Sequence, residues 1–227
     1  RGVSAAGSRA EGKAVTEAQS WADLTVSTVY EASGRKGLLE PGLFRVVPST
    51  RAVGRARTVL CAQDDNLGVH VAIDELQAEE ILVVAMPEPR PVALIGEVLA
   101  TFAKARGAAG LVIDAAVRDL DELATVGLPI WSRWVTSAGA DKIDAGSHNV
   151  SVTVAGQVIR PGELLLLDGD GILRVKSEDE ENTLVAAQQR VTDEEEMMQE
   201  LVAGKSTLDL MALRPLLKQP DVEKTLS

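Results

Sequence analysis

The chain has 227 residues, of which 45% are hydrophobic and 25% are charged, and its formal net charge at pH 7 is −11. This length is enough to bury one substantial core, and no long polar linker divides the middle of the chain, so one main domain is expected. The negative charge disfavours nucleic acid as a partner, because no stripe of Lys and Arg with interleaved aromatic residues offsets it. An anionic ligand would need local positive features, such as a metal ion, an arginine or a helix N-terminus.

The sequence favours a cytoplasmic location. No apolar run approaches the roughly 18 residues that are needed to cross a bilayer, and no secretory signal is recognisable. Cys61 is the single cysteine and cannot form an internal disulfide, so it is interpreted as a small buried hydrophobic residue in a reducing compartment. Residues 1–18 are rich in Ala, Gly, Ser and Glu, and are expected to form a flexible leader or an expression remnant.

Helical and strand-like patterns alternate through the first two thirds of the chain. A helical pattern over 24–32 ends at Ser33-Gly34, and strand-like runs follow at 45–47 and 58–62. Three helix and strand pairs then follow with short connections, namely 67–76 with 81–85, 96–106 with 111–113, and 119–125 with 129–132. This order predicts an α/β core.

The last third changes to hairpins and then to helix. Strands are expected over 150–154, 163–167 and 172–175, joined by turns at 155–157 and 168–171. Asp168-Gly-Asp170-Gly171 resembles the start of a calcium loop but lacks the later oxygen ligands, so a plain turn is predicted. An acidic helix over 178–203 and an amphipathic segment over 208–217 are expected to pack on the core or on a neighbouring subunit.

Two segments carry candidate functional residues. Arg118 and Asp119 end the stretch 110–119, in which a buried strand runs into a turn, and the carboxyl end of such a strand faces the crevice where α/β sheets bind ligands. A structural interpretation stays open, because Asp119 with Glu122 resembles a capping box and Arg118 could pair with a surface acid. Gly96 begins the other segment, where a helix start would leave free N–H groups for a carboxylate.

Other familiar sites find no support in the sequence. It contains no GxxxxGK[ST], GxGxxG, HExxH, CxxC or GxSxG motif, which removes the sequence basis for nucleotide-binding, zincin and esterase functions. His70 and His148 have no acid or thiol close by in sequence. Because His70 shares a helical surface with Leu67 and Ile73, a structural role is favoured for it.

Together these motifs resemble the RraA-like family, in its branch of metal-dependent pyruvate aldolases. The resemblance covers nearly the whole chain after the leader and includes short motifs in a fixed order: Val29–Arg35 with Gly37-Leu38, Asp65-Asn66 with His70, Gly96–Leu99, Ile113–Asp119, Pro129–Ser132, Arg160–Glu163, Asp168–Gly171, and Leu201–Gly204 with Leu208-Asp209 and Arg214. The resemblance implies a swivelling β/β/α fold, with a catalytic domain over 19–177 and a helical C-terminal extension over 178–227. It also implies homotrimers or homohexamers with sites between subunits.

The resemblance further implies a Mg²⁺ or Mn²⁺ cofactor and assigns roles by position. Asp119 would ligate the metal directly, and Glu97 would act through metal-bound water. Arg118 would hold the 2-oxo acid portion of the substrate, while the amides of Val98 and Leu99, just after Gly96, would bind its carboxylate. A site with few protein ligands suits Mg²⁺, because this ion prefers one or two carboxylates and keeps several waters.

A further acidic residue is implied from the C-terminal helix of a neighbouring subunit, where Glu194 or Glu195 fits the spacing. The implied reaction is retro-aldol cleavage of 4-carboxy-4-hydroxy-2-oxoadipate to pyruvate and oxaloacetate, or of 4-hydroxy-4-methyl-2-oxoglutarate to two pyruvate. Oxaloacetate decarboxylation is expected beside it, because it passes through the same pyruvate enolate.

Two alternatives remain open. One branch of the family regulates an RNA-degrading enzyme by protein contact, and there the position of Asp119 is typically not an acid. A Schiff-base aldolase would need a buried lysine, whereas Lys104 is expected to be exposed. The chain departs from the aldolase pattern at four positions, where Ala116 replaces a common glycine, Ile95 an aromatic residue, and Met211 and Leu213 a Tyr and a Met.

Overall fold

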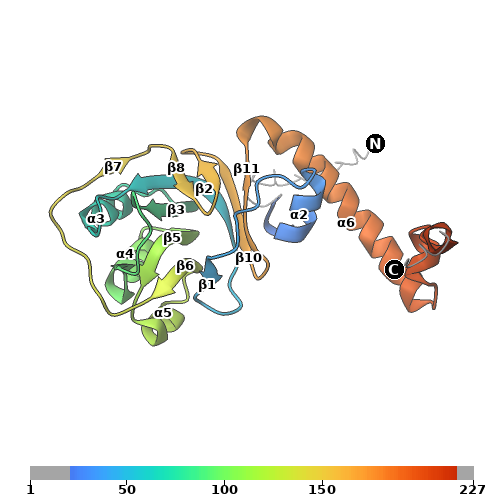
Figure 1. Ribbon diagram of the computed structural model, residues 1–227, viewed down its shortest axis with the longest axis horizontal. Coiled ribbons are helices and arrows are strands. Elements are labelled where there is room, and N and C mark those ends of the chain that lie inside the picture. Colours follow the sequence, from blue (N-terminus) through green and yellow to red (C-terminus); the bar gives the residue numbers. More distant parts are fainter. Residues whose placement is uncertain (1–20, 219–227) are drawn as a thin grey trace, which may run out of the picture.

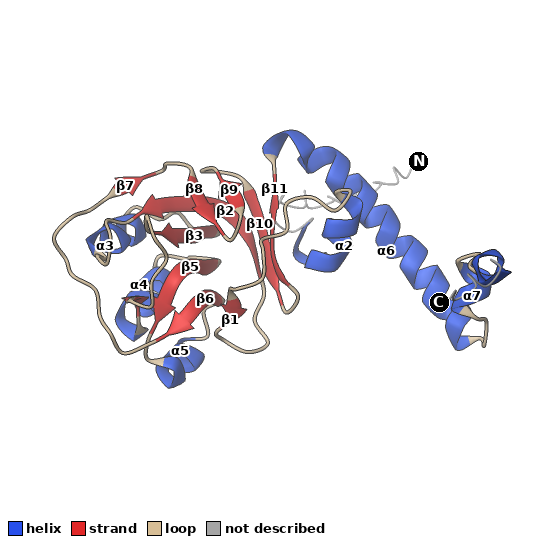
Figure 2. Cartoon of the chain, in the orientation of Figure 1, coloured by secondary structure: helices blue, strands red, loops and turns tan. Residues whose placement is uncertain are grey.

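The computed structural model describes residues 21–218 (Figures 1 and 2). The leader expected over 1–18 therefore lies outside the described residues, as does the end of the C-terminal extension. In the described part, no helix is both long enough and apolar enough to cross a membrane.

The first half of the described chain alternates helices and strands. The elements are α2 (Val26–Ala32), β1 (Phe44–Arg45), β2 (Ala52–Leu60), α3 (Leu67–Asp74), β3 (Glu80–Ala85), β4 (Ala93–Ile95), α4 (Glu97–Ala105), β5 (Gly110–Val117), α5 (Leu120–Val126) and β6 (Ile130–Val135). The second half is mainly hairpins followed by helix: β7 (Ser147–His148), β8 (Val152–Val154), β9 (Gln157–Ile159), β10 (Leu164–Asp168), β11 (Gly171–Val175), η1 (Ser177–Asp179), α6 (Glu180–Val202), α7 (Thr207–Leu210) and η2 (Arg214–Lys218).

One main sheet holds most strands in the order β1-β6-β5-β3-β2-β10-β11. Its centre is parallel, with β2 beside β3, β3 beside β5 and β5 beside β6, while β1, β10 and β11 pair antiparallel at the edges. Every residue of β5 is buried, as expected for a parallel strand covered on both faces. The carboxyl ends of the parallel strands therefore meet at one edge of the sheet.

Three hydrophobic clusters hold the layers together. Helices α3, α4 and α5 pack on one face of the sheet through residues such as Ile73, Leu99 and Leu123. The β8–β9 hairpin covers the other face, where Val152, Val154 and Ile159 join the core. Helix α2 and the start of α6 pack on β10 and β11. Figure 1 shows α6 running away from the sheet, at the opposite end of the molecule from α4 and α5.

The structure confirms the α/β core and the helical C-terminal extension. The turn predicted at 168–171 is also confirmed: it joins β10 to β11, and the Asp168 carboxylate accepts hydrogen bonds from the amides of Asp170 (2.9 Å) and Val26 (2.8 Å). The strand predicted over 58–62 was wrong at its start, because β2 begins at Ala52. The first part of β2 lacks the hydrophobic pattern of a buried strand because it contains Arg55 and Arg57. These half-buried arginines pair with Glu180 and Glu75.

Candidate functional site

The candidate site is built where β5 changes its partner. The first half of β5 pairs with β3, but beyond an irregularity between Ile113 and Ala116 its end pairs with the short strand β4. The amide of Arg118 continues this pairing by donating to the carbonyl of Ile95 (3.0 Å). The residues that follow β4 and β5 are therefore held side by side, at the carboxyl edge where α/β sheets bind ligands.

Asp119 has a strained backbone and a side chain that does not cap a helix. It occupies the N-cap position of α5 with φ 62° and ψ 50°, and its side chain makes no capping hydrogen bond. The capping alternative for Asp119 and Glu122 is therefore wrong. Non-glycine residues in the left-handed region are uncommon, and such strain concentrates at functional sites.

Gly96 lets the two segments approach closely. A Cβ atom added at this position would lie 2.3 Å from Asp119 Oδ2 and 2.9 Å from Arg118 Cγ. In the space left by the missing side chain, the amide of Glu97 donates to Asp119 Oδ2 (3.0 Å). The Arg118 Nε atom lies 3.6 Å from the same oxygen. Gly96 thus lets the backbone amide of Glu97 and the side chains of Arg118 and Asp119 lie together.

Several groups at this edge are free to bind a ligand. Among the described residues, Asp119 Oδ1 and the Glu97 carboxylate have no hydrogen-bond or ion-pair partner, and neither do the first-turn amides of Val98 and Leu99. The Arg118 side chain is half exposed, and among the described residues its ion pair is with Asp119. The N-terminus of α4 adds its positive dipole end to this group.

Val98, Leu99, Arg118 and Asp119 line a cleft of about 220 Å³, whereas Glu97 is not part of its lining. Its lining comes from α3, β4, α4, the end of β5 and the loop before β7: Asn66, His70, Ala93, Leu94, Ile95, Gly96, Val98, Leu99, Arg118, Asp119, Gly139, Ala140 and Lys142. Asp65 ties the loop to α3, because its Oδ2 accepts from the amides of Ile143 (2.6 Å) and Asp144 (3.2 Å). This connection holds Lys142 at the mouth of the cleft.

Asn66 and His70 were not assigned to the site by sequence reasoning. The sequence placed His70 on a packing surface of α3, whereas the structure places it in the cleft lining. Burial, and then the charge of Lys142, lower the pKa of His70, so its imidazole is neutral at pH 7. The sequence did contain one signal for Asn66. Two residues able to cap a helix, Asp65 and Asn66, stand together before α3, and only one of them is needed as the cap, so the other is available for a different role.

Asp114 lies in the same sequence run as Arg118 but belongs to the core. Its side chain is 3% exposed and accepts a hydrogen bond from Arg133 Nε (2.6 Å). Burial raises the pKa of this carboxyl, and the adjacent guanidinium of Arg133 opposes that rise. Of the two acids in the run, only Asp119 faces the cleft. Ala116, which stands where many relatives have glycine, lies in β5 and does not have a positive φ. An alanine therefore fits this position without any change in the backbone.

Glu194 and Glu195 lie far from the cleft of their own chain. Both are on α6, beside a surface hollow that Asp23 and Thr25 also line, and Glu194 pairs with Arg190 (2.8 Å). Lys104 is exposed and donates to the carbonyl of Val126, as expected of a solvated side chain rather than a Schiff-base lysine. No group of three or more His, Cys, Asp or Glu side chains suited to a metal ion occurs within residues 21–218.

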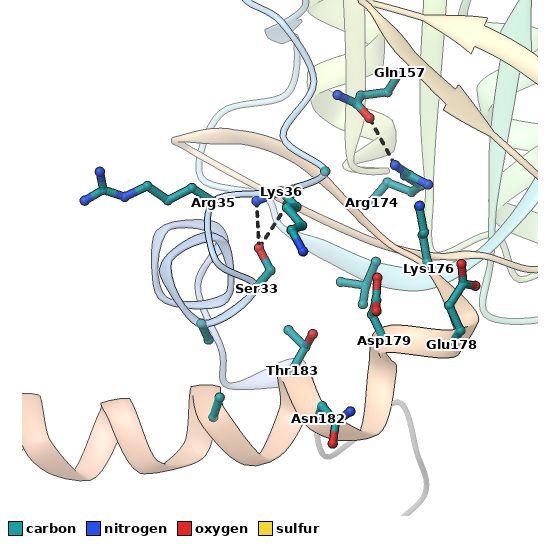
Figure 3. Close-up of a pocket in the computed structure, with 14 residues that line it drawn as sticks. Ser33, Arg35, Lys36, Gln157, Arg174, Lys176, Glu178, Asp179, Asn182 and Thr183 are labelled. Atoms are coloured by element: carbon teal, nitrogen blue, oxygen red, sulfur yellow. Dashed lines mark hydrogen bonds between the residues drawn. The ribbon is translucent and has the colours of Figure 1, made fainter.

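A larger cavity of about 910 Å³ lies between α2, β11 and the start of α6 (Figure 3). It contains none of the predicted site residues. Its cationic side chains are largely matched by acceptors or acids: Arg174 donates to Gln157 (3.1 Å) and Glu163 (3.3 Å), and Glu178 and Asp179 line the same space. The smaller cleft is therefore the better candidate, because its polar groups are unpartnered and converge.

The chain is similar to proteins of one family. Residues 22–174 match the family model described as RraA-like: Aldolase/RraA. A relative from Halalkalibacterium halodurans, named as a candidate 4-hydroxy-4-methyl-2-oxoglutarate aldolase, is 35% identical over 145 residues, which are 64% of this chain and 69% of the relative. A relative with the same name from Burkholderia multivorans is 33% identical over 63% of this chain and 86% of its own.

Two solved structures share the fold. An uncharacterized protein from Pseudomonas syringae pv. tomato superposes with a TM-score of 0.74 at 26% identity, covering 83% of this chain and 93% of that one. RraA from Thermus thermophilis, described as an RNA-processing inhibitor, gives a TM-score of 0.63 at 29% identity over 67% of this chain and 93% of its own. The β/β/α fold that the family resemblance implied is thus confirmed, and the chain belongs to the RraA-like family.

Proposed function

We propose that the protein is a divalent-metal-dependent pyruvate aldolase that cleaves the C3–C4 bond of 4-hydroxy-2-oxo acids. The observation that supports this most directly is that Arg118, the free Oδ1 of Asp119 and the free amides of Val98 and Leu99 meet in one cleft, where the amide of Glu97 donates to Asp119 Oδ2. The substrates would be 4-hydroxy-4-methyl-2-oxoglutarate, which is the substrate in the names of two relatives, or 4-carboxy-4-hydroxy-2-oxoadipate.

The residues of the cleft fit a Mg²⁺ or Mn²⁺ ion. Asp119 has one free carboxylate oxygen, and the exposed Glu97 carboxylate follows directly after Gly96. Mg²⁺ usually takes one or two carboxylates and keeps several waters, so a site with few protein ligands suits it. Asp119 would hold the ion directly and Glu97 through water. The bound ion would polarise the 2-oxo group as a Lewis acid.

The chain's own groups would bind and orient the 2-oxo acid. The amides of Val98 and Leu99 would bind its carboxylate at the positive end of α4. Arg118 would donate to the 2-oxo oxygen, where negative charge grows as the C3–C4 bond breaks and the enolate of pyruvate forms. Oxaloacetate decarboxylation generates the same enolate, so this second activity is included in the proposal.

The proposed active unit is a homotrimer or homohexamer. Glu194 and Glu195 lie on a helix that extends away from the cleft of its own chain (Figure 1). In this arrangement one of them would reach the metal-bound waters of a neighbouring subunit. Light scattering on the purified protein measures the assembly. A fully active monomer would remove this part of the proposal.

A second candidate function is regulation of an RNA-degrading enzyme through protein contact. It is favoured by the likeness to RraA from Thermus thermophilis, which is described as an RNA-processing inhibitor. Asp119 and the free groups around it have no evident use in such a role. Binding to a ribonuclease without any release of pyruvate would favour this second candidate.

The proposed aldolase is tested by Arg118→Ala. The side chain is half exposed and pairs with Asp119 at the protein surface, so its removal should leave folding intact. If Arg118 stabilises the enolate, kcat should fall by about 10²-fold or more, by analogy with oxyanion donors. Arg90→Ala is a matched control, since Arg90 is equally exposed and pairs with Asp64 and Glu88 outside the cleft lining. An unchanged kcat for Arg118→Ala would contradict the assignment.

A further inference from the structure

The wall of the cleft formed by α3 carries two polar atoms without partners. Asn66 is 7% exposed, and its Oδ1 atom is buried without a hydrogen-bond donor among the described residues. Nε2 of His70 is buried and unpartnered in the same way. Both residues line the cleft with Arg118 and Asp119. Buried polar groups are nearly always hydrogen-bonded to protein, to water or to a ligand, so these two atoms mark a place in the cleft where a polar group would be bound.

The geometry of α3 explains why these two side chains share the cleft. Asn66 occupies the N-cap position but does not cap the helix, because Asp65 Oδ1 accepts from the amide of Leu67 instead (2.7 Å). The Asn66 Nδ2 donates to the carbonyl of Leu94 (2.9 Å), which leaves Oδ1 as a free acceptor. His70 lies four residues later, on the same face of the helix.

The two free atoms suit a hydroxyl group. Asn66 Oδ1 can only accept a hydrogen bond, whereas the neutral imidazole of His70 can present an N–H at Nε2. A hydroxyl donates one hydrogen bond and accepts another, so its chemistry matches one free acceptor and one free donor. A carboxylate would satisfy His70 but would leave Asn66 Oδ1 without a donor.

We propose that Asn66 Oδ1 and His70 Nε2 bind the C4 hydroxyl of the 4-hydroxy-2-oxo acid. This inference rests on the proposed aldolase function. With the 2-oxo acid portion held by Arg118 and the amides of α4, the C4 hydroxyl is two carbons further along the substrate, toward the α3 wall. The pair would select substrates with a hydroxyl at C4 and hold that hydroxyl in a fixed orientation.

Oxaloacetate provides an internal test, because it yields the same enolate but has no C4 hydroxyl. His70→Leu removes the proposed contact. It should lower kcat/KM for 4-hydroxy-4-methyl-2-oxoglutarate by roughly 10- to 100-fold, the range expected for a buried hydrogen bond, and should change oxaloacetate decarboxylation by less than about 3-fold. His70→Gln should restore most of the aldolase activity, because its amide can present an N–H near the position of Nε2.

The controls separate the possible failures. His148→Leu is the matched control, since His148 lies outside the cleft lining and bonds to the carbonyl of Ala145 (3.0 Å); the ratio of the two activities should not change. Equal loss of both activities in His70→Leu, or no rescue by His70→Gln, would overturn the hydroxyl assignment. A wild-type protein that turns over neither substrate would overturn the proposed function as well.

Discussion

Gly96→Ala is the substitution for which the structure gives the sharpest expectation. The φ of Gly96 is −139°, which alanine adopts without strain, so the effect comes from the added methyl group alone. That methyl would lie 2.3 Å from Asp119 Oδ2. An ordinary contact is about 3.4 Å, so the carboxylate must move by about 1 Å. It would also lose its hydrogen bond from the Glu97 amide.

A misplacement of about 1 Å in a catalytic group can cost about 10²-fold in rate, which corresponds to about 2.7 kcal/mol in the activation free energy. We therefore expect kcat/KM for pyruvate release to fall about 100-fold in Gly96→Ala. The melting temperature should change little, because the displaced side chains of Arg118 and Asp119 are exposed and can move.

Gly169→Ala is a suitable control for this measurement. Its added methyl would meet Arg45 at an ordinary distance of 3.4 Å, in the turn between β10 and β11. Both variants are assayed for pyruvate release with a coupled lactate dehydrogenase and for unfolding by circular dichroism. Full activity in Gly96→Ala would refute the inference that the contact between Gly96 and Asp119 holds the site together.

Two further predictions follow from single residues. Asp119→Gly should abolish turnover yet keep or raise stability by up to about 1 kcal/mol, because glycine relieves the left-handed backbone; a loss of stability in urea unfolding would contradict this expectation. Burial, and then the charge of Asp65, raise the pKa of the Cys61 thiol to about 12. At pH 8 its reaction with an aromatic disulfide should be on the order of 10³-fold slower in the folded than in the denatured protein, and rapid labelling of the folded protein would contradict this.

The longer elements of the fold could be predicted from the sequence because their patterns are local. Helices α3, α4 and α6 and strands β3 and β5 show hydrophobic periodicity or continuous apolar runs. The short strands β4, β7 and β9 were missed, since two or three residues carry no period, and the partners of β4 and β7 lie far along the chain. The interruption of β5 that admits β4 is likewise set by tertiary pairing.

Only the side of the cleft formed by the ends of β4 and β5 could be predicted from the sequence. Arg118, Asp119 and Gly96 stand at element boundaries, where sequence rules apply, and the structure brings them together. The opposite wall depends on how α3 packs against β4, which no local pattern encodes. Asn66 and His70 were therefore seen as part of a motif or a packing surface until the structure placed them in the cleft.

The most direct test of the proposed aldolase is pyruvate release from 4-carboxy-4-hydroxy-2-oxoadipate and from oxaloacetate, first with Mg²⁺, then with EDTA, then with Mg²⁺ restored. Activity that disappears with the chelator and returns with the metal is the predicted result, and the two rates would rank the substrates. Absence of pyruvate in every condition, from a folded protein, would contradict the proposal and favour a binding role.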